Sequence, residues 1–309
     1  MTATTQPSLP TAIRSLRTRW VLGAAALLGL GFLAAQAQAA LQYHVDASAL
    51  TALSDTNPIN VWPDLAGGND ATASGTARPT YRTGQLGGKP VARFDGNDVM
   101  HSGDILDGVL NGVDNQFTIF VVGRDWAELS NDQILSVYNP RGKDAREMAV
   151  RIDQGNKPEL FTQYHPSASH MRSATGDGLS NAGNVLALTY DGAQDGNDGL
   201  DRFGIYVDGP TNSATLRLNY GDLGDIQNTN AGFAIGGNEN EYSDYTFHGD
   251  LAEILIFDGV LDDYHLNLYG YRMGQKWGIA TAFLAPEPST FLVWSLLAGL
   301  GLWFARRRR

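Results

Sequence analysis

Four apolar segments of this chain end in a pair of turn residues, and this repeated pattern constrains the fold more than any other feature. The segments are residues 185–190 before Asp191-Gly192, 202–207 before Asp208-Gly209, 233–235 before Gly236-Gly237, and 251–257 before Asp258-Gly259. Asp-Gly and Gly-Gly pairs favour tight hairpin turns, because glycine accepts a positive φ without steric cost. The pattern predicts short antiparallel strands joined by hairpins.

Further short apolar segments occur throughout the chain. They are residues 41–45, 61–64, 90–94, 117–122, 134–138, 148–152 and 160–164. About a dozen strands with no long helix between them are typical of a sandwich of two sheets. The prediction is an all-β fold, a two-sheet antiparallel jelly-roll sandwich with one C-terminal helix beside it.

The predicted helix follows the last strand. Its apolar residues recur at intervals of three and four and so share one face: Leu266, Tyr269, Met273 and Trp277. Asp262 or Asp263 can cap its first turn, and Gly278 can end it.

Composition excludes several classes of function. The chain has no cysteine, which removes thiol catalysis and cysteine-based metal sites. Setting aside three arginines near the N-terminus and four at the C-terminus leaves 15 basic residues against 33 acidic ones. Such a surplus of negative charge argues against nucleic acid as a partner, because nucleic-acid binding depends on basic residues that neutralise phosphates.

The N-terminal segment has the order of parts of a secretory signal. Three arginines between residues 14 and 19 precede an apolar stretch at 20–33, and Ala37-Gln38-Ala39 offers small residues to a signal peptidase. We expect residues 1–39 to be a signal peptide cut after Ala39. The alternative is a retained N-terminal anchor.

The C-terminal segment, residues 284–309, has three parts in a fixed order. The motif Pro286-Glu287-Pro288 precedes an apolar stretch, and Arg306–Arg309 ends the chain. Residues 290–305 number 16, a helix of about 24 Å, which is short for a membrane span of roughly 20 residues. We expect a C-terminal hydrophobic helix that serves as a transient membrane anchor, with the arginines on the cytoplasmic face.

These three parts resemble the PEP-CTERM sorting signal of Gram-negative bacteria. The resemblance implies that an exosortase cuts near Pro286, Glu287 and Pro288 after export. The protein would then be released or attached at the cell surface or in the exopolysaccharide matrix of a biofilm. The alternative is an ordinary C-terminal anchor after a proline-rich stalk.

The region between these segments, residues 40–283, resembles a LamG-like, concanavalin A-like jelly roll. The motifs that carry the resemblance are residues 61–67 (VWPDLAG), 79–81 (PTY), 89–96 (KPVARFDG), 249–257 (GDLAEILIF) and 276–278 (KWG). The resemblance implies two stacked antiparallel sheets and, often, binding of glycans or of surface proteins. We expect Trp62, Phe94 and Trp277 in the core, and Glu253 either exposed or paired.

Catalytic motifs are missing from the sequence. Related jelly-roll glycosidases carry a Glu-x-Asp-x-x-Glu pattern that places two carboxylates on one sheet face, and this chain lacks it. It also lacks Gly-x-Ser-x-Gly and His-Glu-x-x-His, and His165 and His170 fit a solvated loop. We therefore expect a non-catalytic protein, not an enzyme. The alternatives are a secreted glycoside hydrolase and a purely structural matrix cargo.

Calcium is the only cofactor that the sequence suggests, because carboxylate and amide oxygens on loops are its usual ligands. The first candidate site is Glu239, Asn240 and Glu241, in a loop similar to the calcium loop of pentraxins. The second is a loop that contains Asp191, Asp195, Asn197, Asp198 and Asp201. This second loop lacks EF-hand spacing and also fits a solvated hairpin tip.

Overall fold

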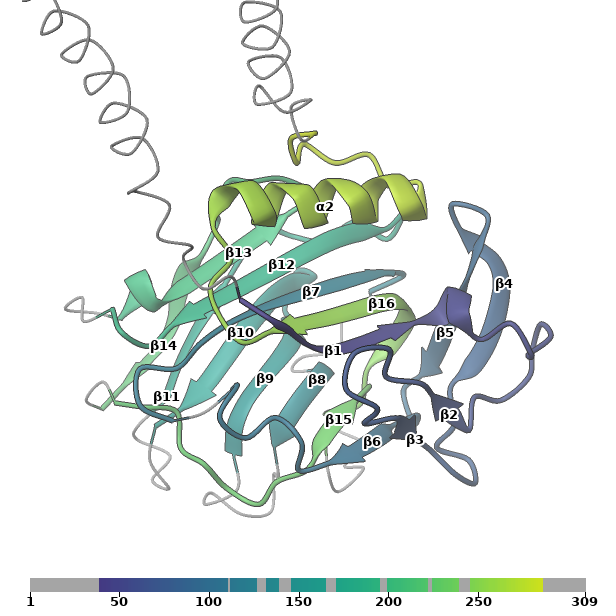
Figure 1. Ribbon diagram of the computed structural model, residues 1–309, viewed down its shortest axis with the longest axis horizontal. Helices are drawn as coiled ribbons and strands as arrows, with labels where there is room; N and C mark the ends of the chain where they lie inside the picture. Colours follow the sequence, from purple (N-terminus) through teal and green to yellow (C-terminus); the bar gives the residue numbers. More distant parts are fainter. Residues whose placement is uncertain are drawn as a thin grey trace, which may run out of the picture. The chain divides into compact units, whose positions relative to one another are not determined.

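The computed structural model describes residues 39–110, 112–126, 132–138, 146–164, 171–194, 199–221, 224–238 and 245–285 (Figure 1). Residues 1–38 of the predicted signal peptide and the tail from Pro286 onward lie outside this part of the chain. Within it, no helix combines the length and the apolar character needed to cross a bilayer.

The described strands form two antiparallel sheets. The first, seven-stranded sheet has the order β13 (Phe203–Val207), β12 (Asn184–Asp191), β7 (Gln116–Arg124), β16 (His248–Phe257), β5 (Lys89–Asp95) and β4 (Thr80–Leu86), with β1 (Leu41–Asp46) also paired to β16. The second, nine-stranded sheet has the order β14 (Thr215–Tyr220), β11 (Met171–Thr175), β10 (Lys157–Gln163), β9 (Arg146–Asp153), β8 (Asp132–Tyr138), β15 (Phe233–Ile235), β6 (Met100–Gly103), β3 (Ala71–Thr72) and β2 (Val61–Trp62). Two short 3₁₀ turns, η2 (Ala47–Ala49) and η3 (Leu200–Arg202), lie in connections.

The main core lies between the two sheets. Alternate side chains of each strand point into it, as the period of two in a strand requires. Trp62 from the second sheet and Phe94 from the first are both fully buried in this core. The prediction of a two-sheet antiparallel jelly-roll sandwich is confirmed, and so is the burial of these two aromatic residues.

The predicted hairpins are mostly wrong, although the strand ends are right. Only Asp191-Gly192 leads to a neighbour in the same sheet, from β12 to β13. After Asp208-Gly209 and Gly236-Gly237 the chain crosses to the other sheet, and after Asp258-Gly259 it enters the helix. A pair of turn residues ends a strand, but it does not determine which sheet the following strand joins. That depends on where the apolar face of the following strand can be buried.

One two-residue hairpin is formed by Gly87 and Gly88 between β4 and β5, where Leu86 pairs with Lys89. Both glycines have positive φ, +55° and +75°. A type I′ turn requires this backbone at both central positions, so the glycines are needed here for their conformation.

The helix α2 (Asp263–Trp277) covers part of the outer face of the first sheet (Figure 1). The Asp262 carboxylate accepts a hydrogen bond from the His265 backbone N–H (2.8 Å) and caps the first turn, and Gly278 (φ +67°) ends the helix. Met273 and Trp277 pack on apolar side chains of β7, β12 and β16 in a second cluster. The helix prediction is confirmed, together with the burial of Trp277.

A bulge in β16 decides which residues of this strand face the helix. The pairing with β7 shifts between Leu251 and Glu253. Leu251 and Ile254 both point into the main core, and Ala252 packs in the cluster beneath α2. The extra residue of the bulge therefore puts Glu253 on the outer face, where strict alternation from Leu251 would have put it in the core.

Candidate functional site

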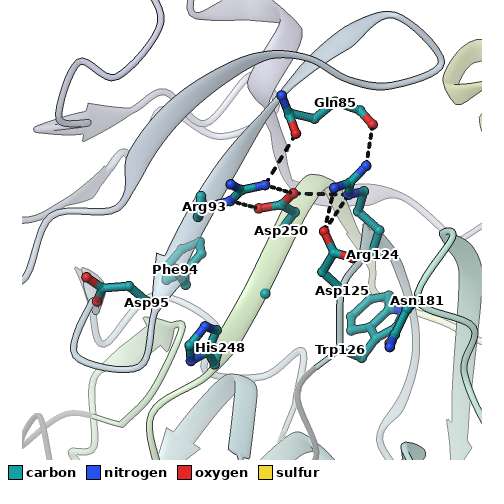
Figure 2. A pocket seen from close by; sticks show the side chains of 11 residues that line it. Gln85, Arg93, Phe94, Asp95, Arg124, Asp125, Trp126, Asn181, His248 and Asp250 are labelled. Carbon is teal, nitrogen blue, oxygen red and sulfur yellow. Dashed lines mark hydrogen bonds and ion pairs between the residues drawn. The ribbon is translucent and has the colours of Figure 1, made fainter.

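A pocket of about 560 Å³ opens beside β5, β7 and the start of β16 (Figure 2). Its lining side chains come from the first sheet and from the segments that follow β7 and precede β12. They are Gln85, Arg93, Phe94, Asp95, Arg124, Asp125, Trp126, Asn181, His248 and Asp250, with Gly249 at the floor. The volume is typical of a small-molecule site.

Asp250 is the buried centre of this pocket and has no solvent exposure. Its Oδ1 accepts a hydrogen bond from Arg93 Nε (2.7 Å), and its Oδ2 accepts one from Arg93 Nη2 (2.8 Å). Arg124 Nε lies 3.2 Å from Oδ2. This two-point bond raises the pKa of Arg93, and burial opposes it less strongly. One carboxylate thus fixes two guanidinium planes.

Two further groups, Asp125 and the Gln85 backbone, hold the guanidinium group of Arg124. Arg124 Nε donates to Asp125 Oδ2 (2.8 Å), and its Nη1 donates to the Gln85 carbonyl oxygen (2.8 Å). Asp125 itself has a left-handed backbone, with φ of +53°, which is uncommon for a residue other than glycine. The turn after β7 therefore directs the Asp125 carboxylate back toward Arg124.

The floor of the pocket requires glycine at position 249. A Cβ atom there would lie 2.6 Å from the Phe247 ring and 2.8 Å from the Asp125 carbonyl oxygen. Trp126 closes one side with its indole almost fully buried, and its Nε1 donates to Asn184 Oδ1 (3.1 Å). Without a side chain at 249, the strand backbone itself forms the base of the cavity.

Several polar groups of the pocket have no protein partner among the described residues. They are Arg93 Nη1, the Asn181 side-chain amide and the His248 ring. Asp95 and Asp125 add exposed carboxylates at the rim. Figure 2 shows these side chains among those that line the pocket. The pocket thus offers both donors and acceptors to a ligand.

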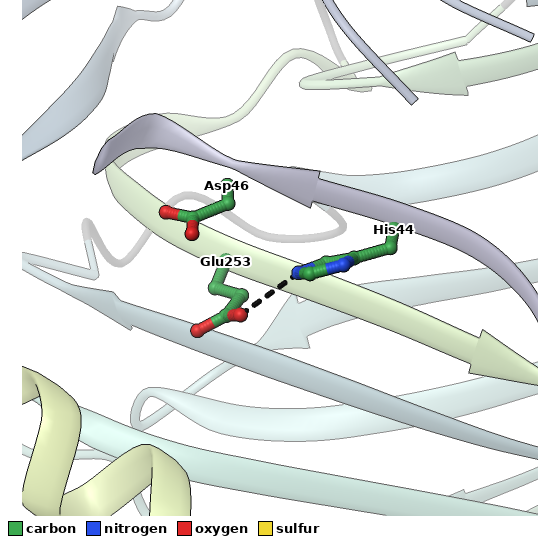
Figure 3. A group of neighbouring side chains, drawn as sticks. All are labelled: His44, Asp46 and Glu253. Atoms are coloured by element: carbon green, nitrogen blue, oxygen red, sulfur yellow. Dashed lines mark hydrogen bonds and ion pairs between the residues drawn. The ribbon is translucent and has the colours of Figure 1, made fainter. Parts of the chain in front are cut away.

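A second polar cluster lies between α2, β1 and β16 (Figure 3). Glu253 is 5% exposed and accepts hydrogen bonds from His44 Nε2 (2.9 Å) and Trp277 Nε1 (2.6 Å). Lys276 Nζ lies 2.8 Å from Glu253 Oε1 and 2.7 Å from Asp46 Oδ2. Burial alone would raise the pKa of Glu253, but the hydrogen bonds from His44, Lys276 and Trp277 outweigh it and lower that pKa.

This second cluster is the only group of described residues with the composition of a metal site. Ligand atoms of His44, Asp46 and Glu253 lie within 4.8 Å of one another. However, the Lys276 ammonium already bridges the two carboxylates. A cation supplied by the chain compensates their charge, so we assign the cluster to holding α2 on the sheet.

The predicted calcium residues fall largely outside the described chain. Glu239, Asn240 and Glu241 lie there, as do Asp195, Asn197 and Asp198. Of the second loop, Asp191 and Asp201 are described, and they are not part of the metal-type cluster above. Asp191 Oδ1 accepts from Gln116 Nε2 (2.6 Å) and its Oδ2 from Gln194 Nε2 (3.0 Å), which supports the end of the strand.

Sequence reasoning missed the pocket, although its residues lie inside the recognised motifs. Arg93 and Asp250 enter the sequence argument only as parts of strand motifs. The available signal was a charged residue within each of two apolar strands, because such residues are almost never buried without a partner. Glu253 was expected to be exposed or paired, and the structure confirms the pairing.

No family model and no curated protein matches this chain. Among solved structures it is similar to domain 4 of AbnA, a GH43 extracellular arabinanase from Geobacillus stearothermophilus in complex with arabinotriose, at 16% identity and a TM-score of 0.44, over 73% of this chain and 95% of that chain. It is also similar to the Ruminococcus gnavus IT-sialidase CBM40 bound to α2,3 sialyllactose, at 16% identity and a TM-score of 0.39, over 50% and 81%. A third is the binding domain of Paraclostridial Mosquitocidal Protein 1, at 12% identity and a TM-score of 0.49, over 75% and 52%. The fold assignment rests on the strand pairings described above, and no ligand is inferred from these structures.

The Glu253 cluster predicts a pH-dependent stability difference. Glu253→Gln should lower the free energy of unfolding at pH 7 by about 3 kcal/mol, because a neutral amide leaves Lys276 and Trp277 poorly paired. The carboxylate, whose pKa is lowered by folding, stabilises the fold above about pH 4.3 and loses that effect as the pH falls through its folded value. Urea unfolding at a series of pH values should therefore show the penalty shrink toward acid.

The matched control for this experiment is Asp55→Asn. It removes one partner of an exposed pair with Arg82, whose side chains are 45% and 30% exposed, and should move the urea midpoint much less. An equal loss in both variants would contradict the assigned role of Glu253.

The ion pairs of Asp250 with Arg93 and Arg124 predict a large loss of stability when the Asp250 charge is removed. Asp250→Asn should lower the free energy of unfolding by about 3–5 kcal/mol, because two guanidinium groups then lose their buried counter-charge. The control is Asp177→Asn, which removes an exposed surface carboxylate. This variant should have the same urea midpoint as the wild type. A wild-type midpoint for Asp250→Asn would show that Arg93 and Arg124 do not depend on this carboxylate.

Proposed function

We propose that this protein is an exported, non-catalytic protein that binds a glycan in the Asp250 pocket. The observation that carries the proposal is the ring of unpartnered polar groups, Arg93 Nη1, Asn181 and His248, around a floor without a side chain. Sugars present several hydroxyl groups on a small apolar ring. Fixed donors and acceptors bind them best, since little side-chain entropy is then lost on binding.

The rigidity of the site supports recognition of this kind. The Asp250 carboxylate holds the Nε and Nη2 edge of the Arg93 guanidinium group, and Nη2 also donates to Gln85 Oε1 (3.3 Å). Its free Nη1 therefore keeps one direction. A donor fixed before the ligand arrives costs less ordering entropy than a mobile lysine would.

Two described carboxylates of the second sheet, Glu159 and Asp153, are held in ion pairs with arginines. A glycosidase of this fold class needs one carboxylic acid with a raised pKa and a second carboxylate nearby. Glu159 is fully buried, yet its ion pair with Arg151 (2.6 Å) outweighs burial and lowers its pKa. Asp153 and Glu159 both pair with Arg217, at 2.8 Å and 3.1 Å. The lowered pKa of Glu159 does not suit it to donate a proton near neutral pH, whereas burial raises the pKa of Asp132 on β8 to about 7.

The route to the cell surface is a proposal from the sequence. A signal peptidase would remove residues 1–39, and an exosortase would act near Pro286-Glu287-Pro288. The order of motif, apolar stretch and terminal arginines supports this route. The mature protein would then work at the surface or in the exopolysaccharide matrix of a Gram-negative bacterium.

The binding proposal predicts a defined loss in one variant. On a glycan array, the purified protein should bind at least one glycan, and Asn181→Ala should weaken that binding about fivefold or more, since one hydrogen bond is worth roughly 1 kcal/mol. Asn230→Ala makes the same change at an exposed residue outside the pocket and should bind as the wild type does. The proposal fails if every glycan on the array stays unbound.

The same array separates the calcium hypothesis from the pocket. Binding measured in calcium and again in chelator should be equal if the described pocket acts alone. Binding that is lost in chelator would support a calcium ion at Glu239, Asn240 and Glu241.

The sorting proposal has its own prediction. C-terminal mass spectrometry of the protein recovered from the cell surface should find chains that end near Pro288 and lack the apolar stretch. Recovery of chains that keep Arg309 would contradict processing by an exosortase.

A further inference from the structure

We infer that the Asp250 pocket takes an uncharged glycan and discriminates against sugars that carry a carboxylate. This inference rests on the proposed glycan binding and goes beyond it to the chemical class of the ligand. Its basis is the balance of charges and of hydrogen-bonding capacities around the cavity.

The two arginines do not make the pocket cationic, because two carboxylates neutralise them. Asp250 binds both guanidinium groups, and Asp125 binds Arg124 again with Nη2 at 2.5 Å from its Oδ2. Asp95 is then left as an uncompensated carboxylate at the rim. The lining thus has two guanidinium groups against three carboxylates, with a net charge of −1 when His248 is neutral.

The unpartnered groups fit hydroxyl groups better than a carboxylate. A hydroxyl group can both donate and accept a hydrogen bond, whereas an ionised carboxylate only accepts. The Asp95 carboxylate accepts from the Asn97 backbone N–H (3.3 Å) and lies beside the Asp98 carboxyl group. The Asp95 and Asp125 carboxylates offer only acceptors, so a ligand must bring donors to them. A carboxylate placed against them would add repulsion and leave three acceptors facing one another.

Arg93 sets the second requirement, an acceptor on the ligand. Arg93 Nη1 needs an acceptor and carries positive charge, and its orientation is fixed by Asp250. Neutral hydroxyl groups satisfy both Arg93 Nη1 and Asp95, which lie two residues apart on β5. The whole chain adds to the discrimination against acidic glycans, since 33 acidic residues against 22 basic ones repel anions in solution.

The test uses oligosaccharides in matched pairs. Gluco-, manno- and galacto-oligosaccharides are compared with the uronic acid oligomers of the same linkage, which differ only by a carboxylate at C6. Binding is measured by calorimetry at pH 8. The neutral member of the bound pair should bind at least about tenfold more tightly at 0.01–0.05 M salt, and higher salt should narrow the difference because it screens the charges.

Two variants assign the discrimination to the pocket. Asp95→Asn removes the uncompensated carboxylate and should reduce the preference for the neutral sugar at least about threefold, mainly by improving uronate binding. Asp177→Asn makes the same charge change on the surface outside the pocket and should keep the wild-type preference.

The outcomes separate this inference from the proposed function. Tighter binding of a uronate, or an equal affinity for both members of the pair, overturns the inference and leaves glycan binding in place. A preference that Asp177→Asn reduces as much as Asp95→Asn also overturns it, because the effect then belongs to the whole chain. Absence of binding to any member overturns the proposed function together with the inference.

Discussion

Strand β16 carries two buried carboxylates, and much of the first sheet is arranged to supply their counter-charges. Asp250 takes its cations from the neighbouring strands, through Arg93 on β5 and Arg124 on β7. Glu253 takes its partners from β1 and from α2, through His44 and Lys276. A buried carboxylate without such partners would cost several kcal/mol, so these four elements are committed to their positions around β16.

The two clusters have different consequences because their partners differ. The Glu253 cluster uses nearly all of its polar atoms within the protein, and it joins the first strand of the sandwich to the helix that follows the last one. The Asp250 cluster fixes its arginines but leaves Arg93 Nη1 and the neighbouring Asn181 without partners among the described residues. The first arrangement closes the fold, and the second creates a rigid surface for a ligand.

Much of this architecture could be predicted from sequence, because strand and helix periodicity report which residues face a core. The strands β7, β12 and β16 and the helix α2 were found in this way. The short strands β3 and β6 were missed, because no Asp-Gly or Gly-Gly pair follows them as Gly236-Gly237 follows β15, and β4 was missed because Gly84 interrupts its alternation. The pocket could not be predicted, because it depends on Arg93 and Asp250, residues 157 positions apart that meet only when β5 pairs with β16.

The bulge between Leu251 and Glu253 has a consequence for how related sequences should be aligned. Removal of one residue here would close the bulge and leave one outer-face residue between Leu251 and Ile254 instead of two. Either Ala252 would be lost from the cluster beneath α2, or Glu253 from its pair with Lys276. The length of this short segment is therefore under a stronger constraint than the identity of most of its side chains. Among related proteins, the connections between the two sheets can gain or lose residues, but the number of residues in β16 should stay the same. A gap within β16 in an alignment would mark a protein that holds its α2 helix in another way.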